Sequence, residues 1–345
     1  MALYLFAVII SVCLQFAFMI PFINFLYRMK FQRVNQATRD AFNKPTPIFD
    51  KFHQHKSGTP VGGGIIIVLM TTVLFLLFLI LFAAFNRSFH SNYPSVIAEI
   101  KIILFTFISF AFLGVYDDLN KIFFWKKRQF FGIRLRHKLI LELILSFIIA
   151  FWLFSDLRIS IINVPFFGVF NISYFYILFA AFVILSFANA INITDGLDGL
   201  AGGILMISLT GFWVVAHAIL DVPTSIFIAV WLGGLISFLY FNIYPARIMM
   251  GDTGALSFGA TFAVVGLILG KGFALPIFGG VFVLEIFSSF IQLLSKKYRH
   301  KKILPVAPLH LWLQLKGWPE PKIVMRFWII GILFSLFGLM ISFMK

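Results

Sequence analysis

The sequence predicts an all-α, polytopic integral membrane protein with about ten transmembrane helices. Composition is the first observation, because 61% of the 345 residues are hydrophobic and only 12% are charged, which leaves more apolar surface than a water-soluble globule can bury. The second is the length of the apolar runs, since about 20 apolar residues cross the hydrocarbon layer as a helix. The runs are continuous and not alternating, which favours helices over the strands of a barrel.

Ten apolar runs are expected to form these spans. They are residues 2–27, 62–85, 99–116, 138–155, 173–190, 199–218, 224–241, 253–270, 272–294 and 327–344. The first run lacks a basic leader region and a small-residue cleavage site, so we expect a retained anchor and not a signal peptide. The polar segments between the runs are too short for a core of their own, and residues 1–345 are therefore predicted to form a single transmembrane domain.

The positive charges predict the orientation of the chain. Of the 28 lysines and arginines, 23 lie in the segments 28–57, 117–138, 242–252 and 295–326. Positive charge in short loops stays cytoplasmic, so these loops are predicted to be cytoplasmic and both termini extracytoplasmic. The net charge of +15 would then face lipid headgroups or polyanionic ligands. Nucleic acid is not expected as a partner, because the orienting signal explains the juxtamembrane basic clusters. The lone Cys13 excludes disulfides and cysteine-type zinc sites.

Five aspartates near predicted cytoplasmic helix ends are the candidate reactive carboxylates, because carboxylates are costly in a bilayer and usually functional there. They are Asp117, Asp118, Asp195, Asp198 and Asp252. They lie in the glycine-containing segments GVYDDLNK, NITDGLDG and MGDTGALSFG, where missing side chains let a ligand approach the backbone. Asp195 and Asp198 are three residues apart, so a helix there would present them on one face.

Acids with asparagine amides and no cysteine favour a hard cation such as Mg²⁺, which takes oxygen ligands and shares them with substrate phosphates. Lys56, Lys121 and Lys138 occur in the same loops and would pair with the remaining phosphate charge. Acids, cation, lysines and a membrane face together predict phosphoryl transfer that involves a lipid, with the active-site loops on the cytoplasmic face.

Each motif also has a structural interpretation. Asp117 and Asp118 could cap a span or pair with basic residues, and Asp252 could be the N-cap of the following span. Gly62–Gly64 could serve helix packing, the lysines could serve orientation alone, and a lone histidine such as His310 is more often structural than catalytic. Their common side of the membrane favours function, since independent structural needs would not gather there.

Five ordered motifs, from about residue 40 to the C-terminus, resemble the polyprenyl-phosphate N-acetylhexosamine-1-phosphate transferases. They are KSGTPVGGG, YDDLNK, NAINITDGLDGLAGG, GDTGALSFG and LKGWPEPKIVMRFWII. The last motif, GWPE followed by Arg-Phe-Trp, is similar to the family members that use a muramoyl-pentapeptide and not to those that use other sugars.

The resemblance implies Mg²⁺-dependent transfer of phospho-MurNAc-pentapeptide from UDP-MurNAc-pentapeptide to undecaprenyl phosphate, which gives lipid I and UMP at the bacterial inner membrane. It implies catalytic roles for Asp117, Asp118, Asp252 and His310, and Mg²⁺ ligation by Asp252 with Asn192. The implied substrate-binding residues are Lys56, Thr59, Lys121, Lys138, Asn189, Asn192, Asp195 and Asp198. Membrane lipid is a further partner, and a homodimer stays open.

The sequence departs from the family pattern at three places that bear on the sugar and peptide. His310-Leu311-Trp312 stands where three histidines are typical, Met249 where an aromatic residue is usual, and Val61 where threonine is. Transfer of another N-acetylhexosamine-1-phosphate from a UDP-sugar therefore stays an alternative. A lipid-linked transporter is a third hypothesis, which predicts ionisable residues near the bilayer midplane; Glu142 and Glu285 are the acids placed within spans.

Overall fold

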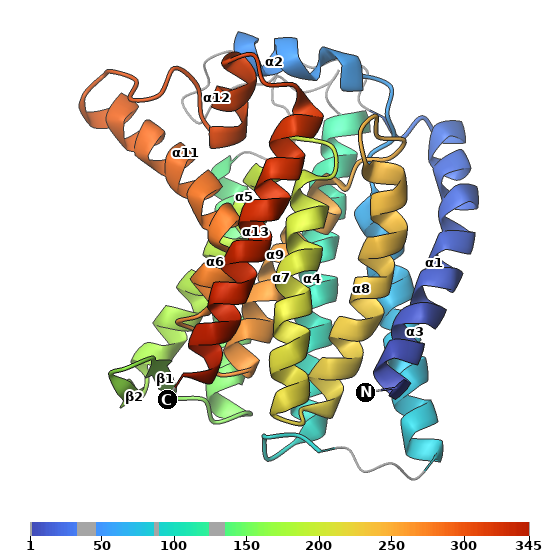
Figure 1. Cartoon of the computed structure of the whole chain (residues 1–345), viewed down its shortest axis with the longest axis vertical. Helices are drawn as coiled ribbons and strands as arrows, with labels where there is room; N and C mark the ends of the chain where they lie inside the picture. Colours follow the sequence, from blue (N-terminus) through green and yellow to red (C-terminus); the bar gives the residue numbers. More distant parts are fainter. Residues whose placement is uncertain (1, 33–45, 86–89, 124–134, 345) are drawn as a thin grey trace.

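The protein is a bundle of long, nearly parallel helices whose two termini lie toward the same end (Figure 1). The computed structural model describes residues 2–32, 46–85, 90–123 and 135–344. Within these ranges, nine helices are long and apolar enough to cross a membrane. The predicted all-α polytopic class is confirmed. The membrane face that the end with the termini meets stays a prediction.

Every predicted span except 272–294 coincides with one of the nine helices. These are α1 (Ala2–Arg28), α3 (Gly63–Ala84), α4 (Val96–Phe123), α5 (Leu135–Ser155), α6 (Phe175–Thr194), α7 (Leu200–Ala218), α8 (Val222–Asn242), α9 (Gly251–Ile268) and α13 (Glu320–Phe343). Helix α9 is buried along its whole length. Its sequence, GDTGALSFGATFAVVGLI, is rich in small residues that let neighbouring helices approach closely. Helix α9 therefore forms the centre of the bundle, whereas α1 and α5 expose apolar side chains outward.

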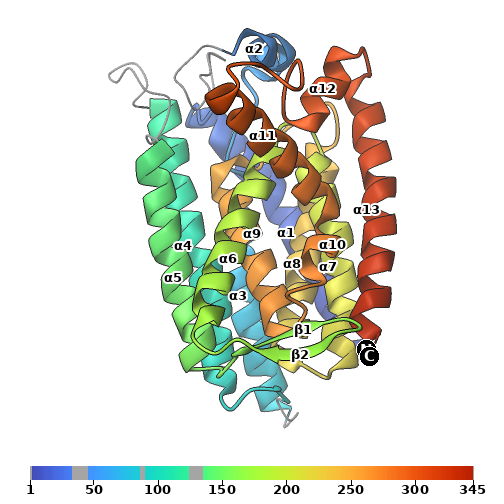
Figure 2. The same cartoon turned by 90° about the vertical axis from the view of Figure 1, so that its left-hand side faces the viewer.

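The predicted span 272–294 is wrong as a single helix. The structure divides it into α10 (Leu275–Phe278) and α11 (Gly280–Tyr298), and α11 leans away from the bundle axis in both views (Figures 1 and 2). Helix α11 carries a polar edge, which we define as Glu285, Ser288, Gln292 and Ser295. Residues three or four apart share one helix face, so this edge gives α11 one polar side that a lipid-facing span would not have.

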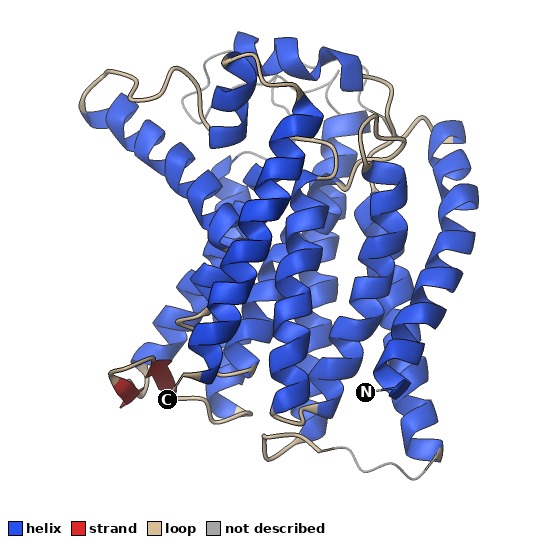
Figure 3. Ribbon diagram, in the orientation of Figure 1, coloured by secondary structure: helices blue, strands red, loops and turns tan. Residues whose placement is uncertain are grey.

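Short elements close the two ends of the bundle. Helices α2 (Pro47–His53), η1 (Gln54–Lys56) and α12 (Leu309–Leu315) lie opposite the termini (Figure 1), and we call this the α12 end. Strands β1 (Ile161–Val164) and β2 (Gly168–Asn171) form an antiparallel hairpin in which Ile161 pairs with Asn171. Figure 3 shows the hairpin near the C-terminus. It was not predicted from the sequence.

Candidate active site

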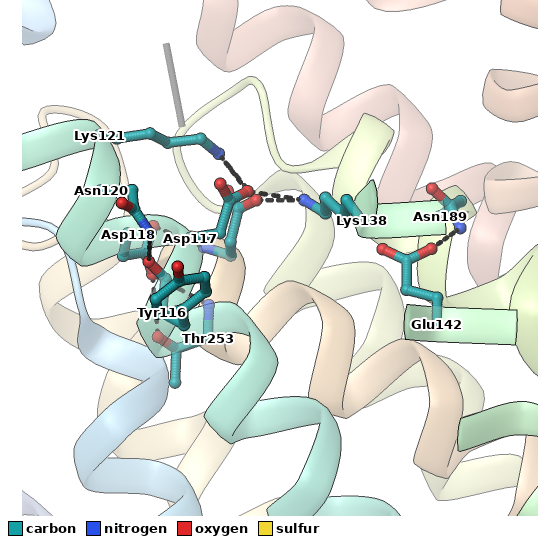
Figure 4. A network of polar contacts seen from close by, with 10 residues as sticks. Tyr116, Asp117, Asp118, Asn120, Lys121, Lys138, Glu142, Asn189 and Thr253 are labelled. Atoms are coloured by element: carbon teal, nitrogen blue, oxygen red, sulfur yellow. Dashed lines mark hydrogen bonds and ion pairs between the residues drawn. The ribbon is translucent and has the colours of Figure 1, made fainter. Parts of the chain in front are cut away.

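Two aspartates and two lysines from three helices meet at the α12 end. Asp117 and Lys121 lie in the last two turns of α4, Lys138 in the first turn of α5 and Asp252 in the first turn of α9. The Nζ of Lys121 lies 3.0 Å from Asp117 Oδ2 and 2.7 Å from Asp252 Oδ2. The Nζ of Lys138 lies 3.0 Å from Asp117 Oδ2 and also pairs with Asp252 Oδ2. Each ammonium thus bridges the same two carboxylate oxygens, and we call this the four-charge cluster. Asp117, Lys121 and Lys138 are labelled in Figure 4.

The four-charge cluster is almost closed to solvent. The side chains of Asp117 and Asp252 are 2% and 7% exposed, and those of Lys121 and Lys138 are 13% and 10% exposed. Buried charges must be paired to be tolerated, and here two carboxylates balance two ammonium groups. The more exposed lysines are the members that an incoming anion would reach first. The predicted grouping of distant acids and lysines is therefore present in the fold.

Asp118 caps a neighbouring helix. Its Oδ1 accepts a hydrogen bond from the backbone N–H of Asp252 at 3.1 Å, and its Oδ2 accepts from the N–H and hydroxyl of Thr253 at 3.0 and 2.9 Å. The first N–H groups of a helix have no partner within that helix, and a carboxylate there is favoured by the helix dipole. Asp118 on α4 therefore supplies the cap of α9. Asp252 itself lies inside the first turn of α9 and is not its N-cap residue.

Two glycines allow α4 and α9 to come this close. A Cβ on Gly114, one turn before Asp118, would lie 2.4 Å from the backbone oxygen of Asp252. Gly251 has a φ of +77°, and a Cβ there would lie 2.8 Å from Asp118 Oδ2. A side chain at either position would therefore move the first turn of α9 away from its cap. The glycines of GVYDD and GDTG thus have a direct structural use beside the acids.

Glu142 and Asn189 form a buried pair next to the four-charge cluster (Figure 4). Glu142 lies one turn after Lys138 on α5, and its Oε2 accepts a hydrogen bond of 2.6 Å from Asn189 Nδ2 on α6. Asn189 also donates to the backbone oxygen of Leu185 at 3.0 Å. The predicted substrate-binding Asn189 is thus held in place by Glu142. Glu142 was not predicted as a site residue, although its position within a span was the signal that could have found it.

A second charged cluster, which we call the Lys56 node, joins Lys56, Asp198 and Glu320. The Nζ of Lys56 donates to Glu320 Oε1 at 2.6 Å and to the Gly196 backbone oxygen at 3.0 Å, and it lies 2.7 Å from Asp198 Oδ1. The ammonium therefore donates two hydrogen bonds, to Glu320 and Gly196, and forms an ion pair with Asp198. Glu320 Oε1 also accepts from the N–H of Asp198. The node therefore fixes the loop between α6 and α7.

The loop between α6 and α7 differs from the expected helix. Helix α6 ends at Thr194 and α7 begins at Leu200, so Asp195 and Asp198 do not share a helical face. Gly199 has a φ of +77°, which suits a glycine and interrupts the helical path. The side chain of Asp198 points toward Lys56 and belongs to the Lys56 node, and its Oδ2 accepts a hydrogen bond from the N–H of Ala246 at 3.0 Å. Asp195 is half-buried at the C-terminal cap of α6.

His310 lies at the start of α12 and faces the same loop. Its Nδ1 is 3.0 Å from Glu285 Oε2, and its backbone N–H donates to Glu285 Oε1 at 3.1 Å. Its Nε2 lies against Gly196, where a Cβ would be only 2.6 Å away. The structure therefore brings His310 beside the Asp195–Gly196 segment, together with Glu285, which sequence reasoning did not include in the site.

The remaining predicted residues and the departures from the family pattern also lie at the α12 end. Thr59 and Asn192 are half-buried, and their binding roles stay predictions. Leu311 is 1% exposed and packs inside, whereas Trp312 carries the Lys316 ammonium 3.9 Å above its ring. The backbone oxygen of Met249 accepts from the N–H groups of Gly62 and Gly63. Leu311 and Trp312 therefore take part in local packing, and Met249 takes part in backbone contacts.

The donor set of the four-charge cluster agrees with the expected Mg²⁺ in kind. In the described ranges, no group of three or more His, Cys, Asp and Glu side chains could hold a metal ion. However, Asp117 Oδ2 and Asp252 Oδ2 converge on the same ammonium groups. Mg²⁺ is usually held by one or two carboxylates and completes its shell with water and substrate phosphates. Two converging carboxylates fit that pattern.

The protein is a helical membrane bundle with acids and lysines gathered at one end. The family model described as glycosyl transferase family 4 matches residues 100–270, a range that contains all members of the four-charge cluster. The fold, the site and this match together define the class of the protein.

Curated relatives narrow this class. A phospho-N-acetylmuramoyl-pentapeptide-transferase of Borrelia garinii subsp. bavariensis is 36% identical over 94% of this chain and 92% of its own. That of Caldanaerobacter subterraneus subsp. tengcongensis is 37% identical over 85% of this chain and 86% of its own. That of Rickettsia akari is 39% identical over 83% and 80%. The chain belongs to the phospho-N-acetylmuramoyl-pentapeptide-transferase family, which confirms the resemblance seen in its motifs.

Proposed function

We propose that the protein transfers phospho-MurNAc-pentapeptide from UDP-MurNAc-pentapeptide to undecaprenyl phosphate, which forms lipid I and releases UMP. This is the first membrane step of peptidoglycan synthesis, and we place it at the bacterial inner membrane with the α12 end toward the cytoplasm. Family membership supports the reaction. The structural observation that carries it is the bridging of Asp117 and Asp252 by both Lys121 and Lys138.

The lysines of the four-charge cluster address the main physical obstacle, which is the repulsion between an anionic lipid phosphate and an anionic diphosphate. Lys121 and Lys138 can exchange their carboxylate partners for phosphate oxygens without leaving the cluster. Their electrostatic effect is strengthened because the site is largely closed to water. A phosphomonoester with a second pKa of about 6 is mostly ionised at neutral pH, so positioning contributes more than proton removal.

The two neighbouring aspartates have different proposed roles. Asp117 faces Lys121 and Lys138 and is the carboxylate placed to orient the lipid phosphate through them. Both oxygens of Asp118 accept hydrogen bonds from α9. We therefore assign Asp118 to positioning Asp252, in place of the catalytic role that the resemblance implied.

Asp252 and Asp117 are the residues that would hold Mg²⁺, and Asn192 stays a second oxygen ligand by resemblance alone. When bound, the ion would offset the negative charge that develops on the departing UMP. The protein's own contribution is to hold the two carboxylates at one point. The cap from Asp118 fixes the start of α9, and the lysines balance the carboxylates before substrate arrives.

The nucleotide is proposed to lie along the loop between α6 and α7. Asp195 in that loop is half-buried and so still accessible, and the Lys56 node holds the backbone of Gly196 from the other side. In this arrangement Lys56 and Asp198 shape the loop, since their charges already pair with each other. The loop then presents backbone groups and Asp195 to the uridine diphosphate.

The other two hypotheses are less well supported. Met249 and Trp312 depart from the family pattern at places that bear on the sugar and peptide, so transfer of a different N-acetylhexosamine-1-phosphate is one outcome of the assay below. The transporter hypothesis depended on intramembrane acids, but Glu142 pairs with Asn189 and Glu285 with His310. Both acids therefore have partners that belong to the candidate active site, and neither is needed to mark an ion path.

The decisive assay offers purified protein UDP-MurNAc-pentapeptide and UDP-GlcNAc in parallel, each with undecaprenyl phosphate and Mg²⁺. We expect UMP release from the first donor only. The Asp252→Asn variant, purified in the same way, controls for contaminating transferases. UMP release from UDP-GlcNAc alone would replace the proposed function by its alternative.

A further inference from the structure

The polar edge of α11 binds the chain segment that returns to the active site. Gln292 Oε1 accepts from the N–H groups of Ile303 and Leu304, both at 3.1 Å, and Ser295 Oγ donates to the backbone oxygen of Lys301 at 2.8 Å. Nearer the bundle, Ser288 Oγ accepts from the N–H of Leu309 at 3.1 Å. Because successive members of the edge bind successive parts of residues 301–310, α11 fixes the position of His310.

Glu285 is the member of the polar edge nearest the start of α11, and it contacts His310 at two points. One carboxylate oxygen accepts from the backbone N–H of His310, and the other lies 3.0 Å from Nδ1 of the ring. Helix α12 has no capping side chain of its own, so the backbone contacts from Ser288 and Glu285 serve as its cap. The ring contact is additional, since capping requires only one of the two carboxylate oxygens.

The ring contact bears on which nitrogen of His310 carries a proton. An ionised carboxylate only accepts hydrogen bonds, and beside an ionised Glu285 the Nδ1 of His310 is the donor. The opposite nitrogen, Nε2, is buried, lies against Gly196 and has no hydrogen-bond partner in the described part of the chain. A buried polar atom without a partner is unfavourable. A ligand that reaches the Asp195–Gly196 segment would supply the missing hydrogen bond.

We propose that Glu285 is a positioning residue, which orients the His310 ring so that Nε2 forms a hydrogen bond to a phosphate or hydroxyl oxygen of the UDP-linked substrate. The proposal rests on the proposed function for the identity of that substrate. It assigns to Glu285 a role in catalysis through His310, beyond capping α12. Carboxylate–imidazole pairs set ring orientation at metal sites, where loss of the carboxylate typically costs roughly 10- to 100-fold in metal affinity or activity.

A double-mutant cycle separates positioning from simple structural support. Glu285→Gln keeps an oxygen that can accept from the backbone N–H of His310, so α12 stays capped while the carboxylate is lost. We expect this variant to lower kcat roughly 10- to 100-fold, with little change in the KM for undecaprenyl phosphate. In the His310→Ala background, the same change at Glu285 should alter kcat by less than about twofold. Equal effects of Glu285→Gln in the two backgrounds would overturn the proposal.

Ser288→Ala is the matched control, because it removes the other hydrogen bond of the α12 cap and leaves the ring untouched. We expect its kcat to stay within about twofold of the parent protein. A loss as large as that of Glu285→Gln would mean that capping explains the effect, and would overturn the proposal as well. The melting temperature in detergent checks that all variants are folded.

Nitrogen-15 spectra of ring-labelled histidine give a readout that does not depend on turnover. The chain has seven histidines, and the signals absent from His310→Ala identify the ring of interest. We expect a protonated Nδ1 in the parent protein and the loss of this preference in Glu285→Gln. An unprotonated Nδ1 in the parent protein would contradict the proposal. If the parent protein released no UMP from any UDP-sugar, the proposed function would fail while these spectra still decided the role of Glu285.

Discussion

The carboxylate of Asp118 accepts a hydrogen bond from the backbone N–H of Asp252 at 3.1 Å. This contact crosses from α4 to α9 and joins two motifs that are 134 residues apart in the sequence. It makes the position of Asp252 depend on Asp118, whose two carboxylate oxygens both accept hydrogen bonds from the start of α9. The two adjacent aspartates of the YDDLNK motif therefore serve different parts of the site.

Replacing Asp118 by alanine should lower both stability and turnover. Loss of a helix cap costs about 0.5–2 kcal/mol, and the start of α9 would lose the group that fixes Asp252. Thermal unfolding in detergent and the kcat for UMP release measure the two effects. Asp118→Asn, which keeps an acceptor oxygen, should be intermediate. An unchanged melting temperature with abolished turnover would instead assign Asp118 to direct substrate contact.

The four-charge cluster predicts a compensating pair of substitutions. Lys138→Met removes one ammonium partner of Asp117 and Asp252, and removing one partner of a buried ion pair costs about 3–5 kcal/mol. Adding Asp117→Asn restores the charge balance, so the double variant should unfold at a higher temperature than Lys138→Met alone. Both variants should be inactive. Purely additive losses of stability would show that the two side chains are not coupled.

The Lys56 node predicts a selective effect on the nucleotide substrate. Glu320→Ala removes the acceptor that Lys56 shares with the N–H of Asp198. A hydrogen bond to a charged group contributes about 1.5–3 kcal/mol, so we expect the KM for the UDP-linked substrate to rise roughly 10- to 100-fold. Glu320→Gln keeps an acceptor and should have a smaller effect. A rise confined to the KM for undecaprenyl phosphate would contradict this placement.

Asp221, at the opposite end of the bundle, predicts a pH dependence of stability. It is the N-cap residue of α8, where its Oδ1 accepts from the N–H of Thr224 at 3.0 Å, and burial raises its pKa above the ordinary value. A carboxyl with a raised pKa in the folded state stabilises the fold when it is neutral. This contribution is fully present below the pKa of the unfolded chain, about 4, and is lost as pH rises through the folded pKa.

Asp221→Asn keeps the capping oxygen and cannot ionise, so it removes the titration of this side chain. We expect equal melting temperatures for the variant and the parent protein in acid, and a growing advantage of the variant as pH rises. Parallel melting curves across the pH range would mean that Asp221 does not titrate with folding.

Sequence reasoning could predict much of the fold because long apolar runs have few alternatives in a membrane. It failed at residues 272–294, because the apolar run is continuous in the sequence while the structure divides it into α10 and α11, and the polar edge of α11 contacts residues 301–310. The contacts between the polar edge and residues 301–310 depend on a turn of the chain that no local sequence pattern predicts. The same limit applies to β1 and β2, whose short strands lie in a connecting segment.

The sequence predicted which residues form the candidate site, but not which contacts join them. The motifs placed Asp117, Lys121, Lys138 and Asp252 at one end of the bundle, and the structure joins them. The sequence could not predict that Glu285 contacts His310 or that Glu320 accepts a hydrogen bond from Lys56, because these contacts link residues far apart in the chain. The separate roles of adjacent aspartates likewise depend on the approach of α9 to α4, which the close contact at Gly114 permits.

The Asp252→Asn variant tests the central claim most directly, because Asp252 joins both lysines, the capped start of α9 and the proposed Mg²⁺ site. The measurement is UMP release from UDP-MurNAc-pentapeptide across a Mg²⁺ titration, with the melting temperature in detergent as the check on folding. We predict a folded protein whose Mg²⁺-dependent release is reduced by about 100-fold or more. Undiminished turnover in a folded Asp252→Asn protein would contradict the account.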